Sequence, residues 1–539
     1  MAKFARLSKA GKPPEIYPVV RPFSFFDFRE KHFGELEPLA RLFSQARFFG
    51  AVTMVVESLN VKSCADLLEE NEDIQKRTGG KSVASQIFRI GFFTKHFKTN
   101  RGLNTAKPED FVGYLITKKD EISGLPSGTR VYESVLPICR TENNFARGES
   151  QFICQVGTKR FPVSGFLYAQ QNALTNVCAH VALRSAVPQF HTDGDMSYRE
   201  MNDLLGIDHQ QKKVGHLPGE PGSGNGLSLA DMITVIDSVG AKTEHANYPS
   251  TLSSSQIPYQ RFLYGSVESG FPAMLVFKTA NSSQHVVPVF GHTFNRDMWV
   301  PSAEASYFRV GPNLRYIPSD SWLSTFICHD DNWGSNFCIP RHYLRTLKQK
   351  KSTAPPGSHS NSEWVSHVIA TLPKNILLTP LRAEVIGLNA LYAMFPLLPN
   401  DGNRWRERLA FYARYSLTVL RTILVTGKEY ADHLDKIDGW KGARIRRNEV
   451  EAFAKYPHLK FWMVELSVPE LFPTNFRKVG EILFFAEKQP DPKQTFNSIV
   501  MARLPGYFVF YNGGDDTNPK FDFLPNQIES HVPLYRCEE

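Results

Sequence analysis

The sequence predicts an α+β protein made of more than one folded unit. Its 539 residues exceed the usual length of a single domain, and 42% hydrophobic with 22% charged residues is typical of a globular chain. Apolar residues recur at helical spacing in some stretches, such as residues 34–43. Short β-branched runs, such as residues 51–56, lie between them and predict strands.

One segment marks the clearest boundary. Residues 348–362 are charged and then rich in Pro, Gly and Ser, without an apolar period, which predicts a flexible linker. Before it we expect an N-terminal α+β unit over residues 1–145, whose role the sequence does not indicate, and a central unit over residues 146–347. After it, residues 363–539 predict a C-terminal α+β unit, a candidate for binding a substrate or partner.

Local patterns predict the elements of the two outer units. The N-terminal unit should contain further strands at residues 85–93 and 112–116. The elements expected in the C-terminal unit are helices at 381–395 and 404–425 and strands at 461–466, 481–485, 498–502 and 507–511.

The central unit places a cysteine at the start of a predicted helix. A polar loop with Gln170, Gln171 and Asn172 leads into Cys178, and residues 178–184 continue with an apolar helical pattern. Unpaired backbone N–H groups and the helix dipole at such a position favour the thiolate, which is the nucleophilic form of cysteine.

Two later segments contain the other groups that thiol catalysis needs. Residues 271–291 predict a strand, a turn and a second strand that His285 heads. Residues 326–334 predict a short strand that leads Asp330 and Asp331 into a Gly-containing turn. A histidine can take and return the thiol proton, and a carboxylate can orient its ring.

Together these segments resemble the papain-like cysteine peptidase superfamily, in particular the bacteriocin-processing (double-glycine leader) peptidases. The resemblance covers roughly residues 146–345 and implies a cysteine-bearing helix packed on an antiparallel sheet that bears the histidine and the aspartate. The segments that match are Gln171, residues 178–183, 270–276, 285–291 and 331–334, with residues 196–205 and 226–236 as the two intervening helices.

The resemblance implies a role for each matched residue. Cys178 corresponds to the nucleophile, His285 to the acid/base, and Asp331, next to the Trp-Gly turn, to the residue that orients the imidazole. Gln171 corresponds to the glutamine that stabilises the oxyanion.

Alternatives stay open at two of these positions. Gln171 lies one residue farther from the cysteine than the family pattern has it, so Asn172 and Gln170 are alternative donors. Asp330 is the alternative to Asp331. Because adjacent residues of a strand face opposite ways, only one of the two is expected to reach the histidine.

The resemblance implies a cysteine peptidase, a thiol-dependent hydrolase that cleaves peptide or isopeptide bonds of a peptide or protein substrate through an acyl-enzyme, without a cofactor. A related acyl transferase or deamidase would use the same residues. The other alternative is a catalytically inactive scaffold that serves as a protein-binding module, because buried cysteines and turn-forming aspartates are also common structural residues.

Metal binding is a competing use of some of these residue types. Cys328, His329 and Cys338 offer soft ligands, and residues 191–195 offer hard ones. Neither group has paired CxxC spacing, an HExxH helix or a calcium-loop pattern, so we expect no metal.

Charge and cysteine usage predict a cytoplasmic protein. The formal charge of +8 is modest, and the basic clusters at residues 341–351 and 440–447 lack a nucleic-acid-binding motif, so no nucleic-acid partner is expected. No apolar run has the length of a signal peptide core or a membrane span. The cysteines show no disulfide spacing and are Cys64, Cys139, Cys154, Cys178, Cys328, Cys338 and Cys537. The oligomeric state is not indicated.

Overall fold

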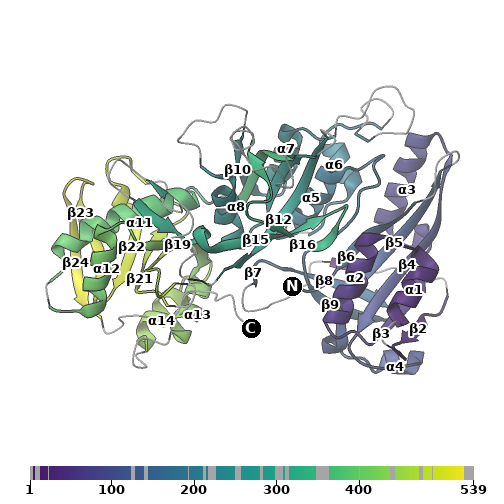
Figure 1. Ribbon diagram of the computed structural model, residues 1–539, viewed down its shortest axis with the longest axis horizontal. Coiled ribbons are helices and arrows are strands. Elements are labelled where there is room, and N and C mark those ends of the chain that lie inside the picture. Colours follow the sequence, from purple (N-terminus) through teal and green to yellow (C-terminus); the bar gives the residue numbers. More distant parts are fainter. Residues whose placement is uncertain are drawn as a thin grey trace, which may run out of the picture.

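The described residues fold into an elongated α+β structure with four sheets, which confirms the α+β class predicted from the sequence (Figure 1). The N-terminal sheet lies at one end, a central sheet in the middle and a C-terminal sheet at the other end. This computed structural model describes residues 4–6, 12–21, 24–122, 128–138, 144–191, 194–209, 214–215, 226–248, 257–279, 283–295, 297, 308–309, 315–346, 363–399, 401–437, 444–472, 477–488 and 490–526.

The N-terminal unit is an antiparallel sheet covered by helices. Its strands follow one another in chain order: β2 (Glu15–Pro18), β3 (Thr53–Ser58), β4 (Ser82–Phe93), β5 (Phe111–Ile122) and β6 (Gly128–Val135). Its helices are α1 (Ser24–Phe33), α2 (Glu37–Phe48), α3 (Ala65–Thr78) and α4 (Asn100–Asn104).

The two faces of this sheet belong to different cores, because successive strand residues point to opposite sides. Met54 and Leu115 pack with α1 and α2, whereas Val55 and Tyr114 pack with α3. The second face also meets a small sheet made of β1 (Phe4–Arg6), β8 (Ser150–Val156) and β9 (Lys159–Gly165).

The central sheet carries the segments that the sequence marked for catalysis. Its order is β10 (Ala241–Asn247), β18 (Trp364–Pro373), β11 (Ala273–Lys278), β12 (Gln284–Phe294), β15 (Leu323–Asp330) and β16 (Gly334–Pro340), all antiparallel. The short strands β7 (Asn144–Ala146) and β17 (Arg345–Thr346) pair with β12 and β18.

Helices lie against both faces of the central sheet. Met274 and Val276 of β11 share a core with α5 (Cys178–Ala186), α6 (Tyr198–Leu204) and α7 (Leu229–Ser238). Leu275 faces the other way, toward α8 (Tyr259–Glu268) and the C-terminal unit. Alternation along one buried strand therefore joins two cores.

The C-terminal unit is a second helix-covered sheet. Its strands, in order, are β13 (Phe308–Arg309), β14 (Arg315–Pro318), β19 (Val419–Thr426), β20 (Lys460–Ser467), β21 (Gly480–Phe485), β22 (Ile499–Leu504), β23 (Tyr507–Gly514) and β24 (Pro519–Pro525). Its helices are α11 (Pro380–Met394), α12 (Arg404–Arg414), α13 (Gly427–Lys436) and α14 (Arg447–Ala454).

One predicted helix is wrong over half its length. Helix α12 ends at Arg414, Ser416 has a left-handed φ of 62°, and Val419–Thr426 form β19 instead of continuing the helix over residues 404–425. The β-branched residues of this stretch favour a strand, and the helical prediction ignored them.

Sheet membership also crosses the predicted unit boundaries. Strand β18 follows the expected linker but lies inside the central sheet, and β14 precedes the linker but pairs with β19. Residues 348–362 themselves lie outside the described residues. A strand joins whichever open sheet edge offers backbone hydrogen bonds, so chain order does not decide its sheet.

Candidate active site

Cys178 is the first residue of α5, as predicted. Val177 before it is extended, with φ −129° and ψ 175°, and the helix packs against β12. The thiol is free and half-buried, and it borders the core beneath the helix. The first N–H groups of a helix have no acceptor within it, so this end presents donors and positive potential around the sulfur.

A histidine in the helix caps its start. His180 Nδ1 accepts from the Val177 N–H at 3.3 Å, and its Nε2 lies 3.0 Å from Asn202 Oδ1. Asn202 in turn donates to the Thr175 carbonyl at 3.1 Å. Burial lowers the pKa of His180 to about 4, so the ring is neutral and free to accept. His180 is therefore a structural capping group.

His285 lies near the start of β12 and contacts the thiol. The Cys178 side chain hydrogen-bonds the buried imidazole. Nε2 lies 3.3 Å from Asp330 Oδ2 and 3.4 Å from Asp331 Oδ1. The structure thus brings Cys178, His285 and both aspartates together, although 107 residues separate the cysteine from the histidine.

The charge state of His285 follows from these neighbours. Burial by itself lowers its pKa, but hydrogen bonds to Asp330 and Cys178 and the charge of both carboxylates outweigh that effect. The net result raises the pKa of His285 from 6.5 to about 11. The ring is consequently an imidazolium at neutral pH, which is the partner that stabilises a thiolate.

The expectation that only one aspartate reaches His285 is wrong. Strand β15 ends at Asp330 with an irregular register after Cys328, and Asp331 already belongs to the turn before β16. Strand alternation therefore does not apply to this pair, and both carboxylates face the imidazole.

The two carboxylates differ in how firmly they are held. Asp330 Oδ1 accepts from the backbone N–H groups of Asn332 at 2.8 Å and Trp333 at 3.2 Å, an aspartate turn that directs Oδ2 at the ring. Asp331 is buried, and by strict geometry neither of its oxygens has a hydrogen-bond partner among the described residues, although the Gln171 amide approaches it.

This loose environment changes the titration of Asp331. Burial raises its pKa from 3.8 to about 6, even though the charge of His285 opposes the shift, and the neighbouring Asp330 adds to it. The ionised form of Asp331 is therefore unfavourable in this buried position, whereas the backbone of the turn fixes Asp330 in place.

The three amide side chains before the cysteine have separate tasks. Gln170 accepts from Val131 N at 2.8 Å and donates to the Asp331 carbonyl at 3.0 Å. The Asn172 amide donates to Glu70 at 3.1 Å and to Thr175 Oγ1 at 2.9 Å. The Asn172 amide thus makes two structural bonds, and the Gln170 side chain accepts one bond and donates one. Gln171, whose amide contacts Asp331, stays the candidate.

The soft metal ligands considered in the sequence are core groups instead. Cys328 Sγ donates to the Phe337 carbonyl at 3.4 Å. His329 accepts at Nδ1 from Asn336 N at 3.1 Å, and its Nε2 lies 3.2 Å from the Phe166 carbonyl. Burial lowers the pKa of His329 to about 3. With both ring nitrogens engaged, His329 has no atom left for a metal.

The hard ligands are also engaged where they are described. Asp195 Oδ2 accepts from Arg184 Nη2 at 2.7 Å, and residues 192–193 lie outside the described part of the chain. Cys338 is exposed on β16.

A different set of atoms has the spacing of a metal site. His285 Nε2 and one oxygen from each of Asp330 and Asp331 lie within 4.8 Å of one another. A divalent cation there would compete with the proton on Nε2, because a metal binds only the deprotonated nitrogen. The raised pKa of His285 favours the proton at neutral pH.

Contacts from the N-terminal unit were not foreseen in the sequence. Arg41 Nε of α2 donates to the Ser335 carbonyl at 2.6 Å, and Gln45 exchanges hydrogen bonds with the same serine. These residues lie about 290 positions apart in the chain, so no local pattern indicates the contact.

Comparison with known proteins adds no relative. The sequence matches no protein-family model, and it has no significant match among curated proteins. None of the described helices has both the length and the apolar character needed to cross a bilayer. The geometry around Cys178 and His285 is therefore the basis on which a function can be inferred.

Proposed function

We propose that this protein is a thiol-dependent hydrolase that cleaves peptide or isopeptide bonds, with Cys178 as nucleophile and His285 as acid/base. The observation that carries the proposal is the contact of one buried imidazole with the Cys178 thiol on one side and the Asp330 carboxylate on the other. A thiol at a helix start, a histidine and a fixed carboxylate form the arrangement that activates a cysteine nucleophile.

The proposed reaction has two steps. The Cys178 thiolate attacks the carbonyl carbon, and the backbone N–H groups at the start of α5 together with the Gln171 amide stabilise the oxyanion. His285 then donates a proton to the leaving nitrogen, the C–N bond breaks and a thioester forms. In the second step His285 takes a proton from water, hydroxide attacks the thioester, and the carboxylic acid and the thiolate are released.

We assign the orienting role to Asp330, one of the two aspartates that the sequence left open. Its second oxygen is tied to the turn, so the oxygen that faces Nε2 has a defined position. Asp331 then adds negative charge beside the imidazolium, and the Gln171 amide approaches its carboxylate. An orienter must hold its own geometry to hold that of the ring, which favours Asp330.

Labelling with a thiol-reactive acyl probe tests the proposal. Cys178→Ala should abolish both labelling and turnover of a protein or peptide substrate library, whereas Cys338→Ala, which removes an exposed thiol, should leave both unchanged. Equal labelling of the wild type and Cys178→Ala would refute a nucleophilic role for this cysteine.

The pH dependence of labelling separates an enzyme from an inactive binding scaffold. If His285 stabilises a thiolate, Cys178 will react with iodoacetamide at pH 6 far faster than the exposed Cys338 does. Comparable rates for the two thiols at pH 6 would favour the scaffold. The products formed in the presence of an added amine then distinguish the two reactions. Hydrolysis releases the carboxylic acid, whereas acyl transfer forms an amide with the added amine.

A further inference from the structure

A compact, hydrogen-bonded loop delivers the nucleophile. This loop, Asn172–Val177, is called the Cys loop. Asn172 Oδ1 accepts from the backbone N–H groups of Leu174 at 2.9 Å, Thr175 at 2.8 Å and Asn176 at 3.2 Å. In the other direction, Asn176 Oδ1 accepts from the backbone N–H of Asn172 at 2.8 Å. The path of the chain into Cys178 is therefore set by two side-chain amides.

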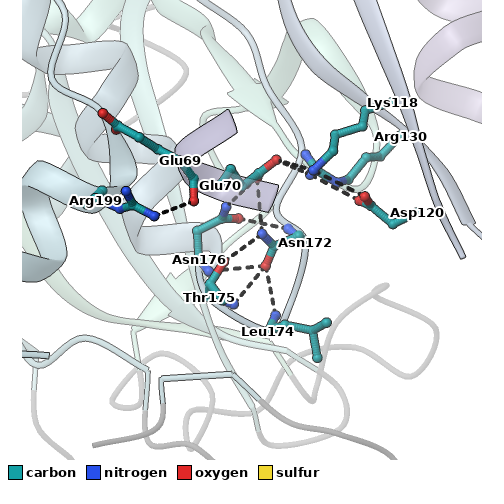
Figure 2. Close-up of polar contacts among 10 residues, drawn as sticks. All are labelled: Glu69, Glu70, Lys118, Asp120, Arg130, Asn172, Leu174, Thr175, Asn176 and Arg199. Carbon is teal, nitrogen blue, oxygen red and sulfur yellow. Dashed lines mark hydrogen bonds and ion pairs between the residues drawn. The ribbon is translucent and has the colours of Figure 1, made fainter. Parts of the chain in front are cut away.

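Both amides are held from outside by one carboxylate of the N-terminal unit. Glu70, buried on α3, accepts through Oε1 from Asn172 Nδ2 at 3.1 Å and from Asn176 Nδ2 at 3.0 Å. Figure 2 shows Glu70 between the Cys loop on one side and the sheet residues Lys118 and Arg130 on the other. The carboxylate thus connects the sheet to the Cys loop, which lies about 100 residues after Glu70 in the chain.

The other oxygen of Glu70 is fixed by charge. Oε2 accepts from Lys118 Nζ of β5 at 2.9 Å and from Arg130 Nη2 of β6 at 2.6 Å, and both cations also contact Asp120. Burial by itself raises the pKa of Glu70, but the charges of Arg130 and Lys118 outweigh it and hold the pKa well below its usual range. Glu70 is therefore an anion with four donors around it, a rigid buried acceptor.

The N-terminal unit also contacts the turn that carries Asp330 and Asp331. Gln170 connects the β6 backbone at Val131 to the Asp331 carbonyl. Arg41 and Gln45 of α2 bind the Ser335 carbonyl just after the aspartate turn. The Cys loop and the aspartate turn consequently rest on one sheet and its helices.

We propose that Glu70 is a positioning residue for the reaction: the N-terminal unit holds the Cys loop through this carboxylate and thereby places Cys178 against His285. The inference rests on the proposed function and gives the N-terminal unit, whose role the sequence left open, a part in catalysis. Rigid support matters because a displacement of about 1 Å at a nucleophile can lower the rate about 100-fold.

Two isosteric substitutions of buried glutamates test this role. Glu70→Gln leaves one positive charge of the Lys118–Arg130–Asp120 cluster uncompensated. Glu57→Gln is the matched control, because Glu57 is also buried in the N-terminal sheet and pairs with a single arginine, Arg89, at 3.0 Å. Among the described residues, Glu57 accepts from Arg89 and from the Gly157 N–H, and neither belongs to the Cys loop or to the aspartate turn.

The readout is the rate of Cys178 alkylation by iodoacetamide, followed by mass spectrometry in the full chain at a temperature where thermal unfolding shows each variant folded. We expect Glu70→Gln to lower this rate about tenfold or more and Glu57→Gln to change it less than about twofold. Equal loss in the two variants would mean that Glu70 contributes only to stability, and the inference would be overturned.

A polarity swap keeps the test decisive if Glu70→Gln does not fold. Asn172→Asp alone places a second carboxylate beside Glu70 and should slow alkylation as strongly, although its oxygen still accepts from the three loop N–H groups. In Glu70→Gln/Asn172→Asp, the amide introduced at position 70 can donate to the new carboxylate, and the charge of the cluster is restored. The double variant should therefore react faster than either single one, and a purely additive loss would contradict the inference.

Hydrogen exchange distinguishes a failure of this inference from a failure of the proposed function. Glu70→Gln should accelerate amide exchange over residues 172–180, and Glu57→Gln should not, whether or not the protein turns over a substrate. If the wild-type Cys178 proves unreactive, the hydrolase proposal fails while this exchange result still stands or falls by itself. Unchanged exchange in Glu70→Gln would refute the positioning role.

Discussion

His285 and Asp330 face each other across the junction of β12 and β15, with Nε2 3.3 Å from Oδ2. The other oxygen of Asp330 is bound by two backbone N–H groups of its own turn. One residue thus forms the turn and also orients the imidazole. Oδ1 of this carboxylate holds the turn, and Oδ2 faces the imidazole.

Replacing each aspartate by asparagine should separate their roles. In Asp330→Asn the amide oxygen can still accept from the turn, but the group facing Nε2 becomes a neutral donor. We expect the rate of Cys178 labelling by an acyl probe to fall about 100-fold. Asp331→Asn should change the rate by less than about fivefold, since its oxygens have looser contacts. The opposite order would assign the orienting role to Asp331.

Asp331→Asn should stabilise the protein at alkaline pH. The folded-state pKa of Asp331 is raised from 3.8 to about 6, so the proton is bound more tightly in the folded state. Its contribution to stability is greatest below pH 3.8 and is lost as the pH rises through 6. Above that pH the folded state holds an unfavourable buried anion, and removing it should add on the order of 1 to 3 kcal/mol.

Urea unfolding of Asp331→Asn and wild type at pH 5 and pH 8 checks this expectation. The gain should be larger at pH 8 than at pH 5, because the wild-type carboxyl is mostly protonated in the folded state at the lower pH. A variant that is less stable than wild type at pH 8 would contradict it.

The imidazolium of His285 should also contribute stability that is lost as the pH rises, but over a higher pH range than that of Asp331. Its pKa rises from 6.5 in the unfolded chain to about 11 in the folded state, so its contribution is complete below pH 6.5 and is lost as the pH rises toward 11. The difference in unfolding free energy between wild type and His285→Gln should shrink over this range by up to about 1.4 kcal/mol per pH unit. Denaturant unfolding at pH 6.5, 8 and 9.5 measures it; a constant difference would show that the ring is not charged.

Arg41→Ala should loosen the aspartate turn from the side of the N-terminal unit. The guanidinium binds the carbonyls of Ser335 and Asn336, directly after the turn. Arg47→Ala is the control, because Arg47 lies on the same helix and bonds the carbonyl of Ala51 within its own unit. We expect kcat to fall several-fold in Arg41→Ala alone, with faster amide exchange over residues 330–336. Equal effects of the two substitutions would refute the contact's role.

The sequence alone determined the local chemistry of the site. The apolar helical pattern after Cys178, the strand that His285 heads and the turn after Asp330 were all predicted, and the structure has each element there. These features could be found because helix period, strand alternation and turn formation depend on residues a few positions apart. The prediction for the residues from Val419 onward was wrong, because it continued the preceding helix although β-branched residues there favour a strand.

Tertiary structure alone decided how these pieces are held together. It brought both aspartates to one imidazole, committed Gln170 and Asn172 to structural bonds, and placed β18 in the central sheet. It also set Glu70 against the Cys loop across about 100 residues. Contacts of this kind depend on burial and on charges that meet only after folding, so they have no period or spacing in the chain.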